Sequence, residues 1–265
     1  MSMTHPIKKH QFLLLFTIIL MCFSAFPALA RVLTSPLSRS VCEKLTPSFE
    51  TELEQFNAQL GDPIFIRIFK ESNELELWIK GEKKYTLFKT YEICSYSGEL
   101  GPKQREGDKQ SPEGFYFVQS NHLNPFSSFH LSFNIGYPNN YDRAYGRTGS
   151  ALMVHGNCVS IGCFAMTDPK VEEIYTLAEA ALKKGQPFFR IHIFPFRMTD
   201  ENMARHKYSK WVKFWKNLKE GYDHFETNRV PPETTVKHKK YVFDTDDRYT
   251  EVIPNQEKHF QLSTR

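Results

Sequence analysis

Residues 152–166 read Leu-Met-Val-His-Gly-Asn-Cys-Val-Ser-Ile-Gly-Cys-Phe-Ala-Met. The apolar residues 152–154 predict a short buried strand that leads directly into His155. Gly162 and Cys163 follow, shortly before a helix that we expect to be capped by Asp168 with Pro169 at its first position. The stretch therefore predicts a histidine and a cysteine on a strand–loop–helix unit, in a chain that contains further strands on both sides.

Apolar residues alternate upstream of this stretch and again downstream of it. Alternation over residues 64–68, 75–79, 85–88, 115–118, 129–135 and 188–194 predicts strands, the first three of them antiparallel. Helical spacing predicts helices over residues 47–60 and from Asp168 to a stop at Gly185. Another helix is expected beyond Pro195, capped near Thr199 or Asp200, with an apolar stripe formed by Trp211, Val212, Trp215 and Leu218.

These elements predict a β-rich α+β domain with a helical C-terminal extension. We expect a signal peptide over residues 1–30, a lead-in helix within 31–61, a catalytic domain over 62–195, and an extension with a polar tail over 196–265. The tail is expected to start near Tyr222 and to be partly disordered. Residues 98–114 and 136–149 are rich in Gly and polar side chains and predict two long surface loops.

The first thirty residues have the layout of a secretory signal peptide. Lys8 and Lys9 precede an apolar run over residues 12–23, and Ala28-Leu29-Ala30 ends it. The run is shorter than the ~20 residues that a membrane span needs, so we expect cleavage, export to the periplasm and no stable membrane span. Lipidation at Cys22 is the alternative, but a lipid-attached cysteine normally follows a small residue and Cys22 follows a methionine.

Removal of residues 1–30 takes away two lysines and no acid, so the formal charge falls from +4 to +2. The remaining basic residues are scattered and matched by acids, which argues against a nucleic-acid partner.

Four cysteines remain, namely Cys42, Cys94, Cys158 and Cys163. Disulfides are the default expectation for such a set in an oxidising compartment. A nucleophile is the second possibility for Cys163, because His155 offers a base and Gly162 leaves the sulfur approachable and the neighbouring amides free for an oxyanion. A zinc site made by His155, Cys158 and Cys163 is the third, although no fourth ligand is evident.

The pattern His155-Gly156, then Ser160-Ile161-Gly162-Cys163 with Met166 behind it, resembles the active-site motif of the L,D-transpeptidase (YkuD-type) family. Ser111-Pro112-Glu113-Gly114 is similar to a Thr/Ser-Pro-x-Gly step common in that family. The resemblance covers about residues 62–195 and implies a β-sandwich-like catalytic fold, a cysteine acyl-enzyme and no cofactor or metal. The acyl donor that it implies is the meso-diaminopimelate carbonyl of a peptidoglycan stem peptide.

Two residues depart from the family pattern. Ile161 stands where most members have a second histidine, and Ala165 stands where they have an arginine. The compact motif is similar to that of a YafK-like subgroup that includes the meso-diaminopimelate–protein amidase, which implies hydrolysis of the amide that joins diaminopimelate to a lysine of a murein-bound lipoprotein. A true transpeptidase forming 3-3 or lipoprotein cross-links, and a non-catalytic peptidoglycan-binding protein, remain alternatives.

We therefore expect Cys163 to be the nucleophile, His155 the base and the carbonyl of Gly156 the group that orients the imidazole. The amides of Gly162 and Cys163 are expected to hold the oxyanion, with Ser160 in support. Arg147 is a candidate for binding a diaminopimelate carboxylate, and His130 a weaker substrate-binding candidate. A Cys42–Cys94 bridge is preferred over a Cys158–Cys163 bridge, which would silence the nucleophile.

Overall fold

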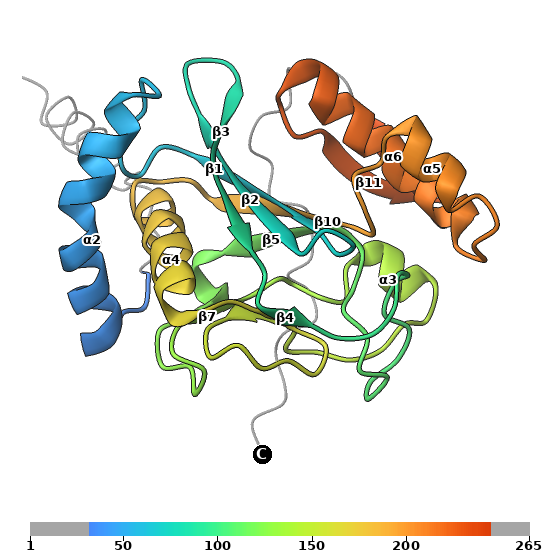
Figure 1. Cartoon of the computed structure of the whole chain (residues 1–265), viewed down its shortest axis with the longest axis horizontal. Helices are drawn as coiled ribbons and strands as arrows, with labels where there is room; N and C mark the ends of the chain where they lie inside the picture. Colours follow the sequence, from blue (N-terminus) through green and yellow to red (C-terminus); the bar gives the residue numbers. More distant parts are fainter. Residues whose placement is uncertain (1–31, 245–265) are drawn as a thin grey trace, which may run out of the picture. The chain divides into compact units, whose positions relative to one another are not determined.

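Two five-stranded sheets form the frame of residues 32–244, the part of the chain that the computed structural model describes (Figure 1). The expected signal peptide over residues 1–30 lies outside the described residues. The first sheet has the order β3-β2-β1-β10-β5. Its strands are β1 (Ile64–Phe69), β2 (Glu74–Lys80), β3 (Tyr85–Glu92), β5 (Gly114–Gln119) and β10 (Phe188–Phe194).

The first three strands of this sheet form the antiparallel meander that the alternation predicts, with Ile66 opposite Leu77 and Leu77 opposite Lys89. β10 is added parallel to β1, and β5 pairs antiparallel with β10. A parallel neighbour has to be reached through a crossover. The elements from β2 to α4 lie between β1 and β10 in the sequence and form this crossover.

The second sheet carries the motif of residues 152–166 and has the order β4-β9-β8-β7-β6. Its strands are short: β4 (Ser95–Tyr96), β6 (Leu123–Asn124), β7 (Ser132–Asn134), β8 (Met153–His155) and β9 (Phe164–Ala165). A 3₁₀ turn, η1 (Ser120–His122), leads from β5 into β6. β8 and β9 are parallel, with Val154 opposite Phe164 and His155 opposite Ala165.

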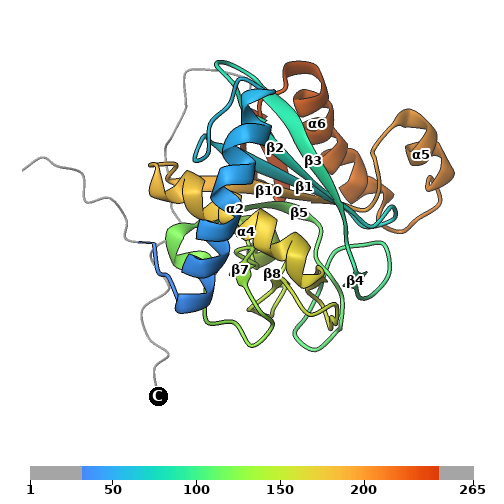
Figure 2. The same ribbon diagram turned by 60° about the vertical axis from the view of Figure 1, so that its left-hand side comes forward.

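The main core lies on the face of the first sheet that carries Ile64, Ile66 and Ile68. Helix α4 (Asp168–Lys183) packs on this face and also contacts β7 and β8, so it joins the two sheets. Helix α2 (Pro36–Glu54) lies against α4, as Figure 2 shows. Every second side chain of β1 meets the side chains on one face of α4 here. This is the packing that the alternating and the helical spacing of apolar residues predict.

The opposite face of the first sheet is also covered, because Phe65 and Phe69 of β1 lie under helix α6 (Val212–Asn228). Every residue of β1 is therefore buried. The apolar stripe predicted for the extension is core packing, with Trp215 only 2% exposed. Helix α5 (Asp200–Arg205) precedes α6, and the hairpin of β11 (Glu233–Lys237) and β12 (Lys240–Asp244) packs beside it.

Two helix predictions need correction. The first helix begins at Pro36, well before residue 47, because Ser35 and Ser38 form a reciprocal cap at its start. Pro47 is inside this helix, which ends at Glu54. The helix expected beyond Pro195 is two helices, and Thr199 caps the first of them by accepting from the N–H of Asn202. The second prolongs the ordered structure to Asn228, past the predicted start of the polar tail.

Other boundaries also differ from the prediction. The strand expected over 129–135 shortens to β7, because His130 adopts a positive φ of 67° that breaks the extended backbone. Residues 233–244 of the expected polar tail form the hairpin β11–β12, and the rest of that tail, residues 245–265, lies outside the described residues. The loop over 136–149 contains a short helix, α3 (Asn140–Ala144). Within residues 32–244, no helix is both long and apolar enough to cross a bilayer.

A fully buried ion pair between Lys70 and Glu113 ties this frame together. The ammonium of Lys70 donates to the carbonyls of Glu99, Gly101 and Ser111 as well as to Glu113. Glu113 in turn accepts from the indole N–H of Trp215 on α6, at 2.8 Å. The pair connects the end of β1, both ends of the 98–114 loop and the C-terminal helix.

Replacing Lys70 by Met should therefore lower the free energy of unfolding by about 3–5 kcal/mol, because Glu113 would be left as an uncompensated buried charge. Urea denaturation followed by circular dichroism measures this loss. Lys219→Met is the matched control, since Lys219 pairs with Asp223 on the surface and should cost less than about 1 kcal/mol. Similar losses in the two variants would contradict a special role for the buried pair.

Candidate active site

Strands β8 and β9 bring His155 and Cys163 to one face of the second sheet. Val154 and Phe164 are paired and fully buried in the core. Side chains alternate along a strand, so Met153 and His155 on β8 lie on the other face, together with Cys163 at the start of β9. The N–H of Met153 approaches the Sγ of Cys163 at 3.4 Å. The base predicted from sequence thus lies at the end of β8, and the predicted nucleophile immediately before the adjacent strand β9.

His155 is held by its own backbone neighbour. Its Nδ1 lies 2.6 Å from the carbonyl oxygen of Gly156. A carbonyl can only accept, so Nδ1 carries the proton and the lone pair is on Nε2. The ring of Phe129 packs against the imidazole at 4.9 Å between ring centroids. Burial lowers the pKa of His155, an effect that the hydrogen bond to Gly156 partly offsets, so the imidazole is neutral at pH 7 and able to accept a proton.

Cys163 is a free thiol in a half-buried position. Burial raises the pKa of its thiol above that of an ordinary cysteine, while the N–H of Met153 and the positive charge of Lys103 act in the opposite direction. At neutral pH the resting pair is therefore a thiol and a neutral imidazole. A thiolate has to be generated during the reaction by proton transfer, which is the role of a general base.

Three contacts with neighbouring residues hold the segment between His155 and Cys163 in place. Cys158 is joined to Cys94 by a disulfide. The hydroxyl of Ser160 donates to the carbonyl of Cys163 at 2.7 Å. Asp168, at the start of α4, accepts from the N–H of Asn157 at 2.8 Å. These contacts hold a short loop in which Asn157 and Cys158 both have positive φ angles.

The disulfide corrects the preferred cysteine pairing and also bears on the zinc site that was kept as an alternative. The Cys42–Cys94 bridge is wrong, because Cys42 is free and its thiol contacts Glu179 on α4. The zinc site is wrong as well, since Cys158 is committed to Cys94 and cannot act as a thiolate ligand. Within residues 32–244, no group of three His, Cys, Asp or Glu side chains has the arrangement of a metal site.

Gly156 and Gly162 fit their positions for different reasons. A Cβ at Gly156 would come within 2.5 Å of Asp168 Oδ1, so only glycine allows this close approach. Gly162 has a φ of 110°, which side chains disfavour, and it directs the chain into Cys163. Among the loop contacts of the described residues, neither the amide of Gly162 nor that of Cys163 donates a hydrogen bond. Both are available for an oxyanion.

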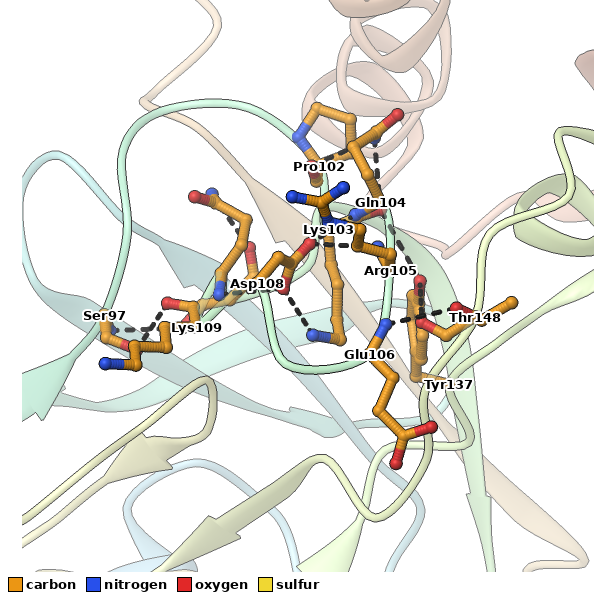
Figure 3. Close-up of polar contacts among 12 residues, drawn as sticks. Ser97, Pro102, Lys103, Gln104, Arg105, Glu106, Asp108, Lys109, Tyr137 and Thr148 are labelled. Atoms are coloured by element: carbon orange, nitrogen blue, oxygen red, sulfur yellow. Dashed lines mark hydrogen bonds and ion pairs between the residues drawn. The ribbon is translucent and has the colours of Figure 1, made fainter.

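Lys103 reaches the site from the 98–114 loop, which Figure 3 shows in detail. Asp108 organises this loop by accepting from Lys103 Nζ and from the N–H groups of Gln104 and Arg105. Although burial alone raises the pKa of Asp108, these donors hold it below its ordinary value. The hydroxyl of Thr148, in the 136–149 loop, accepts a hydrogen bond from the N–H of Glu106 at 3.1 Å and so connects the two loops.

Arg147 and His130, the two candidates for substrate binding, both contact other residues of the protein. Arg147 is 7% exposed and pairs with Asp142 at 2.8 Å, with its guanidinium over the rings of Tyr141, Tyr145 and Phe214. It is therefore neither a solvated loop residue nor free to bind a carboxylate in this arrangement. His130 lies beside the site, and its Nε2 is 2.9 Å from Glu172 of α4.

Sequence reasoning missed Lys103, Asp168 in its loop-holding role, and the Cys94–Cys158 pairing. No local pattern distinguishes Lys103 from other lysines. Asp168 was expected as the helix cap, but Thr167 occupies that position and leaves the carboxylate of Asp168 for Asn157. The pairing of Cys94 follows from β9 lying beside β4, which is a long-range contact.

Comparison with known proteins agrees with the geometry. Residues 63–237 match the family model described as YkuD: L,D-transpeptidase catalytic domain. The chain is 49% identical over 210 residues to the protein named "Putative L,D-transpeptidase YafK" in Escherichia coli K12, covering 79% of this chain and 85% of the relative, and equally so to its O157:H7 counterpart. The helical cell shape determining protein Pgp2 from Campylobacter jejuni aligns with 15% identity and a TM-score of 0.40, covering 70% of this chain and 79% of Pgp2.

The resting protonation state can be tested by alkylation of Cys163 with iodoacetamide in a Cys42→Ala background. Burial raises the pKa of Cys163 above that of an ordinary cysteine, so the thiol is mostly protonated at pH 7 and the alkylation rate should keep rising with pH beyond the range in which an ordinary cysteine titrates. Lys103→Met should move the curve to still higher pH, because it removes a charge that stabilises the thiolate. A rate that levels off below pH 7 would instead indicate a preformed thiolate–imidazolium pair.

The disulfide can be tested by the double replacement Cys94→Ser and Cys158→Ser. The bond closes a chain segment of 64 residues, so its loss should lower the free energy of unfolding by about 4 kcal/mol. Guanidinium denaturation measures the change. Cys42→Ser, at a free cysteine, is the control and should lose much less. An unchanged stability in the double variant would show that the loop is held by its hydrogen bonds alone.

Proposed function

Because the chain belongs to the L,D-transpeptidase catalytic domain family, a family of cysteine enzymes that act on peptidoglycan, we propose that Cys163 forms an acyl-enzyme with the meso-diaminopimelate carbonyl of a stem peptide. The observation that carries this proposal is the joint placement of Cys163 and a neutral His155 whose Nδ1 is fixed by Gly156. A binding protein has no need of a free nucleophile beside an oriented base.

The chemical steps follow from the protonation states. The Sγ of Cys163 attacks the amide carbonyl while its proton passes to Nε2 of His155. The amides of Gly162 and Cys163 stabilise the oxyanion of the tetrahedral intermediate. The imidazolium then returns the proton to the leaving amine, and the C–N bond breaks to give a thioester. Water, deprotonated by His155, releases the acid and restores the thiol.

The bond that we propose for cleavage joins diaminopimelate to a lysine of a murein-bound lipoprotein. The support is the compact motif of residues 155–166 with Ile161 in place of the family's second histidine. Transfer of the acyl group to an amine is the second candidate, favoured by the name of the relatives that are 49% identical. The two reactions share every step up to the thioester.

We also place the protein in the periplasm. The pattern of residues 1–30 supports export, and a disulfide between Cys94 and Cys158 is typical of an oxidising compartment. The substrate is found in the same compartment.

Turnover of purified sacculi that carry bound lipoprotein, followed by mass spectrometry, tests this function. Cys163→Ala should lower the rate on the order of a thousandfold or more, and His155→Ala by about a hundredfold to ten-thousandfold. Cys42→Ala is the control and should keep the activity, because Cys42 lies on α2 against Glu179. Released lipoprotein supports hydrolysis, new cross-links support transfer, and full activity of Cys163→Ala would refute the mechanism.

A further inference from the structure

Three apolar side chains are exposed around the catalytic pair. Ile161 is 76% exposed and Val159 is 56% exposed, both in the loop between His155 and Cys163. Phe129 is 43% exposed and packs against the ring of His155. We call Phe129, Val159 and Ile161 the apolar rim. Single exposed apolar residues are ordinary, but three that bracket one nucleophile and its base are not scattered.

The outward direction of the rim is built into its loop. Cys158 is bonded to Cys94, and Ser160 points inward to the carbonyl of Cys163. The residues between and beside these two anchors, Val159 and Ile161, are thereby turned to solvent. On the other side, the backbone carbonyl of Phe129 accepts from the N–H of Gly156 at 3.0 Å, which fixes the ring beside His155.

The chain segment that carries Val159 and Ile161 also lacks charge, whereas the carboxylates of Asp168 and Glu172 lie next to Asn157 and His130. Residues 149–167 contain no Asp, Glu, Lys or Arg, so His155 is the only titratable side chain apart from the cysteines. The positive charge that acts on Cys163 comes from Lys103, on the separate 98–114 loop. A stem peptide, with its carboxylates and small side chains, finds no charged partner within residues 149–167. Apolar side chains of a substrate would instead find apolar partners at the rim.

The chemistry decides which half of the substrate lies over the rim. His155 has to return its proton to the leaving nitrogen, so the amine half of the scissile amide lies on the His155 side, next to Phe129. We infer that the apolar rim receives apolar side chains of the polypeptide that carries the leaving lysine, from positions close to that lysine in its sequence. This inference rests on the proposed function and names what recognises its protein half.

Two synthetic substrates with the same acyl donor separate this recognition from the chemistry. In one, the diaminopimelate of a muropeptide is amide-linked to the lysine of a short peptide with leucine and valine beside the lysine. In the other, the same muropeptide is linked to Nα-acetyl-lysine amide. The quantity measured is the ratio of kcat/KM for the first substrate to that for the second, with the wild-type protein as reference.

Ile161→Ser should lower this ratio about tenfold, since it removes most of one apolar side chain from the contact. The loss should lie in KM, because the contact is equally present in the bound substrate and in the transition state. Ile161→Leu, which keeps the apolar area, should restore the ratio. Tyr208→Ser is the control, because Tyr208 is 89% exposed on the connection between α5 and α6, and it should leave the ratio unchanged.

The outcomes are distinguishable. A ratio well above one that falls in Ile161→Ser and returns in Ile161→Leu supports the rim as a polypeptide-binding surface. Cleavage of both substrates with equal efficiency, or an unchanged ratio in Ile161→Ser, overturns the inference while the proposed function stands. If the wild-type protein cleaves neither substrate, the proposed function fails and the inference fails with it.

Discussion

The buried pair of Lys70 and Glu113 is the constraint on which the rest of the fold depends. A lysine ammonium without water is stable only if its protons are all satisfied, and here three backbone carbonyls and one carboxylate surround it. Those carbonyls belong to the 98–114 loop, so its two ends are drawn to the end of β1. Through Trp215 the same carboxylate fixes α6 over the second face of the sheet. The loop that brings Lys103 to Cys163 thus starts from a rigid base.

The catalytic pair itself is positioned by backbone groups rather than by a network of charges. Gly156 supplies a carbonyl to His155, and Met153 supplies an N–H to Cys163. Burial keeps the imidazole of His155 neutral, because the backbone carbonyl of Gly156 offsets the lowering of its pKa only in part, whereas a carboxylate partner would raise the pKa further. The carboxylates nearby have other roles, since Asp168 holds Asn157 and Glu172 engages His130. The candidate site therefore combines an imidazole whose orientation is fixed with a thiol whose pKa is raised by burial.

Local patterns carried the prediction of the strands, whereas the prediction of Cys163 and His155 as a catalytic pair rested on the resemblance of their motif to the family. Alternation at Ile64, Ile66 and Ile68 identified β1, and the strand before His155 followed from its apolar residues. What could not be predicted depends on contacts between distant segments. The second buried face of β1 requires α6, and the partner of Cys158 requires β4 beside β9. The start of α2 was missed for a different reason, because the Ser35 cap was overlooked in favour of Pro47.

The Cys94–Cys158 bond also bears on how the nucleophile withstands oxidants. A cysteine oxidised to a sulfenic acid commonly condenses with a neighbouring thiol, and Cys158 is only five residues from Cys163 in the chain. With its sulfur already bonded to Cys94, Cys158 offers no such thiol. An oxidised Cys163 would have to be rescued by a reductant from outside the protein, and without one it would be open to the irreversible sulfinic and sulfonic states.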